Sequence, residues 1–262
     1  MPSVLACPHC ALPLRRTDTG AVCDGNHNFD RAREGYLNLL VGGRLPAGTT
    51  PGDTAESLAA RRRFLYTGAY APVSDAVNNA IGDAEGPVLD VGCGEGWYLS
   101  RIDRANRTGI DISKKAVQMA AKSMPDDSFA VANAHRMPVL DASCGAVVSV
   151  FAPHPFAEFA RVLRPGGIWV TATPGPLHLR EMRPAYEPGA AAIDRFDRRA
   201  EPPAGAGHSE RVTFTLPLSE QTANDLWEMT PLQFQAGSVR SNVGSVTVDV
   251  WVSSGRVATV GP

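Results

Sequence analysis

From residue 88 onward, short apolar runs alternate with helical patterns, and this alternation limits the possible folds more than any other feature. The apolar runs are VLDVG, RTGID, FAVAN, GAVVSVF and GIWVTAT. Helical stretches such as SKKAVQMAAKSM and HPFAEFARVL separate most of them. This spacing predicts a parallel sheet that is covered by helices on both faces. RVTFTLPL and SVTVDVWV, with the helix-like SEQTANDLWEM between them, predict two last strands at one edge of the sheet.

The first strand runs into a turn with glycine at every second position. The run is Asp90-Val91-Gly92-Cys93-Gly94-Glu95-Gly96. Glycine permits positive φ and lets a ligand approach the backbone closely. A tight loop without a ligand would explain one such turn, but the strand before it and the helix after it favour a binding site. The leading carboxylate of Asp90 suits a cationic amino group and would repel a pyrophosphate, so the turn differs from the G-x-G-x-x-G of dinucleotide sites.

Polar residues also follow the next two strands. Asp111 ends RTGID, 21 residues after Asp90, where an acid accepts the ribose hydroxyls of adenosine in related α/β folds. Asn133 follows the third strand, where an adenine ring can be read. The carboxyl ends of parallel strands share one edge, where open sheets bind ligands. With no Walker lysine present, these residues predict an S-adenosylmethionine site, and Phe151-Ala152-Pro153 after the fourth strand faces the expected entry of the methyl acceptor.

Three of the five cysteines lie in the first 23 residues. Cys7, Cys10, Cys23 and His27 form the spacing C-x2-C-x12-C-x3-H, which supplies three thiolates and one imidazole. Four such ligands make a closed, structural Zn²⁺ site. A redox pair would leave Cys23 and His27 unexplained, and a disulfide framework fits poorly with an intracellular chain. Cys93 and Cys144 have no visible base nearby, so we expect neither to be a nucleophile.

Composition and charge narrow the function classes. The chain has 262 residues, 44% of them hydrophobic, and a net charge of −2. It therefore has no excess of basic residues that would indicate a nucleic-acid binder. No secretory leader or apolar run of membrane length is visible, which predicts a cytoplasmic protein with no membrane contact. We expect a zinc module over 1–40, a linker with a helical lead-in over 41–87, and the α/β domain over 88–262, including a mobile Pro- and Gly-rich excursion over 184–210. Asp53 and Glu56 form a capping pattern that predicts the start of the lead-in helix.

Several longer runs together resemble one protein family. They are CPHC, C-x3-H-NFD-RAREGYLNLL, PGDT, RRRFL-x-TGAY, DVGCGEGWY, ARVLRPGG and TATPGPLHL, spread over residues 7 to about 182. In order and spacing they resemble the RlmA family of large-subunit rRNA guanine-N1 methyltransferases, some relatives of which confer macrolide resistance. The resemblance implies an α/β fold of the class I S-adenosylmethionine-dependent methyltransferases, Rossmann-like with a mostly parallel seven-stranded sheet, and a small N-terminal zinc-binding module.

The resemblance also implies site residues and a substrate. Cys7, Cys10, Cys23 and His27 match the zinc ligands of the family. Its cofactor contacts match Tyr70, Gly94, Glu95 and His178, which join the residues already singled out, namely Asp90, Gly92, Gly96, Asp111 and Asn133. Taken alone, Tyr70 could equally be a packing aromatic and His178 a helix cap. The implied substrate is N1 of a guanine in a hairpin loop of 23S rRNA, in the helix 35 region, bound by a homodimer; no catalytic base is identified.

Two other functions remain open from the sequence. The chain could methylate a small molecule, or it could be a zinc-dependent RNA-binding protein without catalysis. The intact turn from Asp90 to Gly96 argues against the second. Arg61, Arg62 and Arg63 could contact RNA phosphates or form an ordinary solvated helix face. The last third of the chain departs most from the family pattern.

Overall fold

The computed structural model describes residues 4–40, 54–183, 201–234 and 243–258. Its contacts divide the chain into two compact units. The first unit comprises residues 1–52, 81–170 and 255–262, and the second comprises residues 53–80 and 171–254. Two long strands, β9 (Leu163–Pro174) and β11 (Ser245–Arg256), contribute residues to both units.

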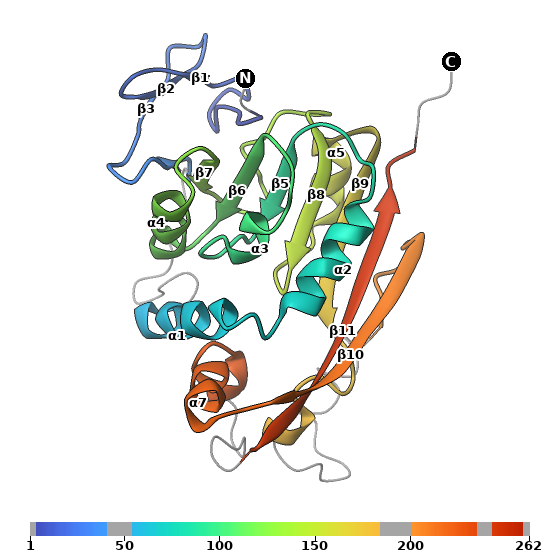
Figure 1. Ribbon diagram of the computed structural model, residues 1–262. Helices are drawn as coiled ribbons and strands as arrows, with labels where there is room; N and C mark the ends of the chain where they lie inside the picture. The colour runs from blue at the N-terminus through green and yellow to red at the C-terminus, as the bar shows by residue number, and fades with distance from the viewer. Residues whose placement is uncertain (1–3, 41–53, 184–200, 235–242, 259–262) are drawn as a thin grey trace. The chain divides into compact units, whose positions relative to one another are not determined.

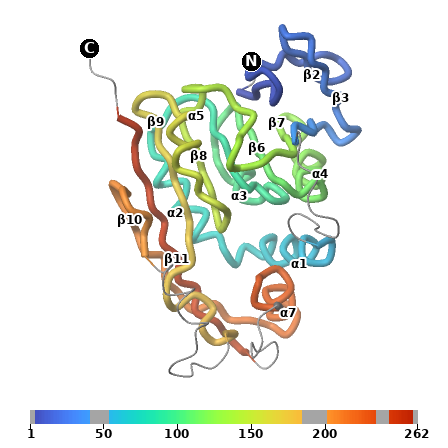
Figure 2. Tube along the Cα trace, turned by 180° about the vertical axis from the view of Figure 1, so that it is seen from behind, coloured from blue at the N-terminus to red at the C-terminus, as the bar shows by residue number. Residues whose placement is uncertain are grey.

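The first unit contains the predicted parallel sheet (Figures 1 and 2). Its strands follow the order β9-β8-β5-β6-β7-β4. The five predicted strands of this region are β9, which contains GIWVTAT, together with β5 (Val88–Val91), β6 (Arg107–Asp111), β7 (Ser128–Val131) and β8 (Cys144–Val150). Strand β5 pairs in parallel with both β6 and β8. The connecting helices are α3 (Trp97–Ser100), α4 (Lys114–Ser123) and α5 (Phe156–Val162). β5 and β8 are buried along their whole length, as expected for strands covered on both faces.

The N-terminal module is hydrogen-bonded into this sheet. Its own three-stranded antiparallel sheet consists of β1 (Arg15–Arg16), β2 (Gly20–Val22) and β3 (Asn28–Asp30). β4 (Leu37–Asn38), which the sequence did not predict, then pairs in parallel with β7. The residues just before the cysteine cluster in the sequence also form backbone hydrogen bonds. The Ala6 N–H donates to the Pro138 carbonyl at 2.8 Å, and the Leu140 N–H donates to the Val4 carbonyl at 2.9 Å. The module is therefore anchored at both ends: β4 joins the α/β sheet, and Val4 to Ala6 bond to the connection between β7 and β8.

The second unit combines helices with a strand hairpin. Its helices are α1 (Ala55–Tyr66), α2 (Ala71–Ile81, with its last residue in the first unit) and α7 (Glu220–Glu228), with short 3₁₀ turns at Arg180–Met182 and Pro231–Phe234. β10 (His208–Pro217) pairs antiparallel with β11, which lies next to β9. Helix α1 packs on α7, where the Arg63 Nε donates to Asp225 at 3.0 Å. Arg63, one of the three arginines considered from the sequence as RNA phosphate contacts, therefore forms an ion pair within the protein.

Other expectations can be compared directly with the structure. The N-cap of α1 is Thr54, whose hydroxyl accepts from the Ser57 N–H at 3.1 Å, whereas the predicted cap Asp53 lies outside the described residues. Most of the predicted linker (41–53) and much of the predicted excursion (184–200) also lie outside them. Strand β10 already begins at His208, within the predicted excursion. Among the described residues, no helix combines the length and the apolar character that crossing a membrane requires.

Candidate active site and metal centre

The glycine turn after β5 has the conformation that its sequence predicts. Gly92, Gly94 and Gly96 have φ of 77°, 55° and 84°, in the region that L side chains rarely adopt. The Gly92 and Cys93 N–H groups both donate to the Ile110 carbonyl, at 2.8 and 3.0 Å, which ties the turn to β6. A Cβ at Gly92 would lie 2.4 Å from the Cβ of Ala152. The turn is thus packed too closely against the segment after β8 to accept a side chain there.

Three acids, Asp90, Glu95 and Asp111, lie in or beside this turn. Asp90 is buried, with 2% of its surface exposed, and its Oδ2 has no hydrogen-bond partner among the described residues. Burial, and then the charges of Asp111 and Glu95, raise the pKa of Asp90 to about 8. Glu95 is also buried. The Asp90 carboxyl is buried, has an oxygen without a partner and lies beside two more acids. A bound cation would therefore stabilise its ionised form.

Asp111 has a structural role that its position alone did not reveal. Its Oδ2 accepts from the Gly94 N–H at 2.9 Å, and its Oδ1 accepts from the Ser113 N–H at 2.7 Å. The carboxylate therefore holds the glycine turn and the start of α4 together. A carboxylate oxygen can accept more than one hydrogen bond, so a contact with ribose hydroxyls is compatible with both of these bonds. Asn133 is exposed, and its side-chain oxygen accepts from the His135 N–H at 2.9 Å.

Tyr70 and His178 contact each other within the second unit. The Tyr70 hydroxyl lies 3.5 Å from the His178 Nε2, and both side chains are buried. The Asp249 N–H donates to the His178 Nδ1 at 3.2 Å, which places the ring proton on Nε2. Burial, and then the charge of Arg183, lower the pKa of His178 to about 4. The imidazole is therefore neutral near pH 7, with its Nε2–H toward Tyr70.

Asp249, which no sequence motif singled out, organises this part of the second unit. Its side chain is fully buried. Arg211 donates to both oxygens at 2.7 and 2.9 Å, the Leu177 N–H donates to Oδ2 at 2.8 Å, and the Thr213 hydroxyl donates to Oδ1 at 3.0 Å. Burial alone would raise the pKa of Asp249, but these bonds outweigh it and lower the pKa. An acid in the middle of the apolar run SVTVDVWV was the available signal.

The cysteine cluster has the geometry of a tetrahedral metal site. One ligand atom from each of Cys7, Cys10, Cys23 and His27 lies within 4.8 Å of all the others. The Cys10 and Cys23 sulfurs are 3.6 Å apart, and the three sulfurs lie 3.4–3.5 Å from the His27 Nδ1. Metal–sulfur bonds of about 2.3 Å and metal–nitrogen bonds of about 2.0 Å give tetrahedral edges of about 3.8 and 3.5 Å. Three thiolates and one imidazole therefore fit Zn²⁺ with no open position.

The two other cysteines are buried and poorly nucleophilic. Burial is the main cause that raises the pKa of Cys93, and the charges of Asp90, Asp111 and Glu95 add to it. Burial raises the pKa of Cys144 to about 11. Both thiols remain protonated near pH 7, which agrees with the expectation that neither attacks a substrate.

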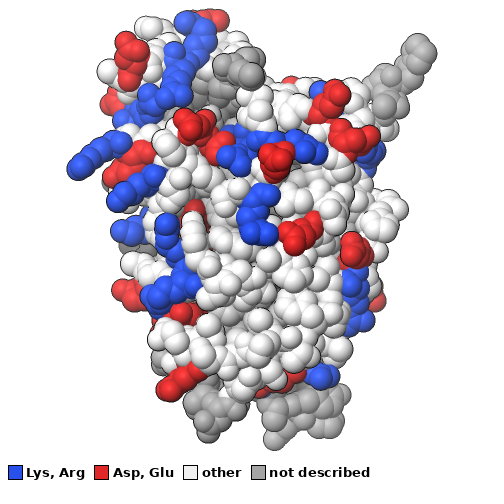
Figure 3. Space-filling model, in the orientation of Figure 1, with Lys and Arg blue, Asp and Glu red and all other residues white. Residues whose placement is uncertain are grey.

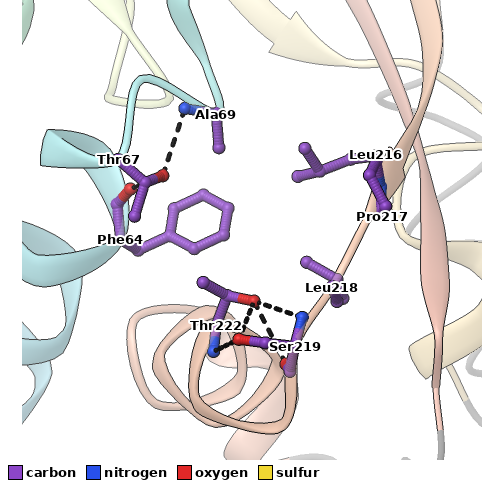
Figure 4. Close-up of a pocket in the computed structure, with 8 residues that line it drawn as sticks. All are labelled: Phe64, Thr67, Ala69, Leu216, Pro217, Leu218, Ser219 and Thr222. Atoms are coloured by element: carbon purple, nitrogen blue, oxygen red, sulfur yellow. Dashed lines mark hydrogen bonds between the residues drawn. The ribbon is translucent and has the colours of Figure 1, made fainter.

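The second unit has a cavity of about 320 Å³ (Figure 4), and none of the predicted site residues lines it. Its polar groups already bond to one another: Thr67 with the Phe64 carbonyl and the Ala69 N–H, and Ser219 with Thr222 in a capping box. No polar groups converge on a ligand in this cavity. Its lining consists of Phe64, Thr67, Ala69, Leu216, Pro217, Leu218, Ser219 and Thr222.

The fold and the turn together define a class of enzyme. A parallel α/β sheet, a D-x-G-x-G-x-G turn with a buried acid and a second acid after the next strand are the features of a class I S-adenosylmethionine-dependent methyltransferase. A model described as a methyltransferase domain matches residues 89–171, and one described as the RlmA N-terminal region, a zinc ribbon, matches residues 5–41.

Curated relatives extend this likeness over most of the chain. A 23S rRNA (guanine(748)-N(1))-methyltransferase from Streptomyces fradiae is 36% identical over 87% of this chain and 84% of its own length. A putative enzyme of the same kind from Micromonospora griseorubida is 36% identical over 80% and 81%, and one from Bacillus subtilis strain 168 is 32% identical over 95% of each chain. The chain belongs to the RlmA family. It is a methyltransferase that uses S-adenosylmethionine and carries a structural zinc ribbon.

Gly92→Ala tests the packing of the turn. The new Cβ would meet Ala152 at 2.4 Å and would hold a strained φ, so we expect the free energy of unfolding to fall by about 2–3 kcal/mol and cofactor affinity to fall about tenfold. Gly35→Ala is the matched control, because Gly35 has φ of 103° with nothing within 4 Å of a Cβ. Urea unfolding and calorimetric titration measure both effects. Equal losses in the two variants would contradict the close packing.

Proposed function

We propose that this enzyme methylates N1 of a guanine in a hairpin loop of 23S rRNA, in the helix 35 region. The observation that carries the proposal is that the zinc-ligand cluster and the glycine turn belong to one compact unit, tied together by β4 and by the Val4–Ala6 segment. A metal ribbon fixed to a methyltransferase sheet suits an acceptor that is a large folded molecule. The named activity of the relatives supports the same acceptor.

S-Adenosylmethionine supplies an activated methyl group on a sulfonium, so the main task of the chain is to align that group with the acceptor. We assign Asp90 to the cationic end of the cofactor, because its buried oxygen has no other partner. Asp111 keeps the turn in shape and faces the ribose, and Gly92, Gly94 and Gly96 leave space for the ligand. We further assign cofactor contacts to Glu95, Asn133, Tyr70 and His178.

The acceptor imposes two further conditions. N1 of guanine carries a proton that leaves during transfer, to a base of the protein or to water. A guanine inside RNA must also leave its stack to enter a pocket, which favours a loop over a duplex interior. Basic and acidic side chains are mixed over the face shown in Figure 3, so charge alone does not mark an RNA surface on that face. A cytoplasmic location and a homodimer belong to the same proposal, and light scattering tests the dimer.

The direct test is methylation of purified RNA. The zinc-loaded protein is incubated with a 23S rRNA transcript and S-adenosylmethionine labelled in the methyl group. We expect label in the RNA and a reverse-transcription stop at one loop guanine, since a methyl group at N1 blocks base pairing. Turnover of a small metabolite without labelling of RNA would favour the small-molecule alternative. RNA binding without cofactor binding would favour the non-catalytic alternative.

Cofactor binding should release a proton. Because the pKa of Asp90 is raised to about 8, this carboxyl is mostly protonated at pH 7 in the free protein. A bound cation favours the carboxylate, so affinity should rise with pH up to about 8 and then level off. Calorimetry at pH 7 in buffers of different ionisation enthalpy should show release of about one proton. Asp90→Asn should abolish the release and weaken binding by about 10- to 100-fold; heats that do not depend on the buffer would contradict this role.

A further inference from the structure

Phe151 has an unusual backbone conformation for an aromatic residue. It follows the carboxyl end of β8 directly, with φ of 53°, and its side chain is 38% exposed. The other described non-glycine residues with positive φ are Ala11, Asn26, Asn106, Ala142 and Leu179. A bulky side chain in this region costs free energy, and such strain gathers at functional sites. Phe151 is therefore a strained, partly exposed ring at the edge of the sheet where the cofactor turn lies.

The segment around Phe151 is fixed against the glycine turn. Ala152 is the residue whose Cβ would lie 2.4 Å from a Cβ at Gly92. The buried Ser149 hydroxyl donates to the Pro153 carbonyl at 3.0 Å, which closes the chain around Phe151. The strained conformation is thus held from both sides and keeps Phe151 next to the turn.

Other aromatic rings lie beside Phe151 in the same unit. The Tyr98 ring centroid lies 6.4 Å from that of Phe151, with an angle of 58° between the planes. Trp97, which is buried, packs edge-on against Tyr98 at 4.8 Å. Trp97 and Tyr98 belong to α3, which directly follows the glycine turn in the sequence. The aromatic group therefore lies next to the glycine turn. Phe151 is its exposed member.

We propose that the exposed face of Phe151 stacks on the guanine that receives the methyl group; this rests on the proposed function. Stacking uses the flat face of a base and leaves uncovered its Watson–Crick edge, which carries N1. Aromatic side chains hold unstacked bases in this way in many RNA-binding sites. Phe151 then positions the acceptor beside the cofactor, and the strain at its backbone keeps the ring at that edge.

Substitutions of Phe151 separate stacking from a structural role. With a 23S rRNA transcript, Phe151→Leu should lower kcat/KM by about 10- to 100-fold, whereas Phe151→Trp should stay within about threefold of the native enzyme. Cofactor affinity should be unchanged in both. Phe151→Asn should lower kcat/KM as much as Phe151→Leu while its melting temperature equals or exceeds that of the native enzyme, because asparagine accepts positive φ.

A matched variant and a modified RNA complete the test. Phe156→Leu alters another partly exposed ring, which packs 5.0 Å from Trp169, and should leave kcat/KM nearly unchanged. With an RNA that lacks the base at the target position, the native and Phe151→Leu enzymes should bind equally well. If the native enzyme methylates rRNA and Phe151→Leu is equally active, the stacking proposal is overturned and the proposed function stands. A native enzyme that labels no rRNA would overturn the proposed function, and the stacking proposal with it.

Discussion

Replacing Cys23 with alanine is expected to release the zinc, unfold the ribbon and abolish rRNA methylation while cofactor binding persists. The ribbon strands β1, β2 and β3 have two or three residues each, so they are too short to be stable without the metal. Apparent zinc-binding free energies in small zinc modules reach about 10–16 kcal/mol, and this energy is folding energy. We therefore expect a loss of rRNA methylation of at least about 100-fold, the equivalent of about 3 kcal/mol.

The matched control for this prediction is Cys144→Ala, which removes a buried thiol that is not a ligand. Metal content, circular dichroism and cofactor titration are measured on both variants. Cys144→Ala should keep one zinc per chain and its rRNA activity. Full rRNA activity of a zinc-free Cys23→Ala enzyme would contradict the role of the ribbon. Deleting residues 1–40 is a poorer test, because it would also remove β4 and expose the edge of β7.

Replacing Asp249 with alanine is expected to destabilise the second unit strongly. The fully buried carboxylate accepts bonds from Arg211, Thr213 and Leu177, and its loss leaves their donors without a partner. Removing one member of a buried ion pair costs about 3–5 kcal/mol. Because the pKa of Asp249 is lowered, its contribution is present near pH 7 and should be lost as pH falls below about 4. Urea unfolding at pH 7 and at low pH measures both effects.

Asp83→Ala is the control for Asp249→Ala. Asp83 also pairs with an arginine, Arg256, at 3.1 Å, but its side chain is 93% exposed. An exposed pair of this kind contributes about 0–1 kcal/mol, so the unfolding midpoint should barely move. If Asp249→Ala unfolds at the same urea concentration as Asp83→Ala, the buried cluster does not stabilise the unit as described.

The elements that carry the cofactor turn could be predicted because their signals are local. A strand of four buried residues, VLDV, followed by alternating glycines predicts both β5 and its turn. The zinc cluster was equally predictable, since four ligands within 21 residues match four coordination positions. The helices α4 and α7 match the predicted helical runs SKKAVQMAAKSM and SEQTANDLWEM, and the structure shows Ser113 and Ser219 as their N-caps.

Contacts between distant residues could not be predicted in this way. Strand β4 is two residues long and pairs with β7 more than 90 residues later. Two residues are too few for a hydrophobic period that would predict a strand. The partners of Asp249 lie 36 to 72 residues away along the chain. The positive φ of Phe151 follows from packing around Ala152 and Ser149, which a sequence pattern does not encode. The cofactor roles proposed for Tyr70 and His178 come from family resemblance, because neither residue lies in a local motif that predicts them.

The most direct test of the central claim is primer extension on 23S rRNA from cells with and without this gene. The account predicts a reverse-transcription stop at one guanine of the helix 35 loop when the gene is present. The stop should vanish on deletion, return with the native gene and fail to return with Asp90→Asn. An identical stop in the deleted strain, or no stop in either strain, would contradict guanine-N1 methylation by this enzyme.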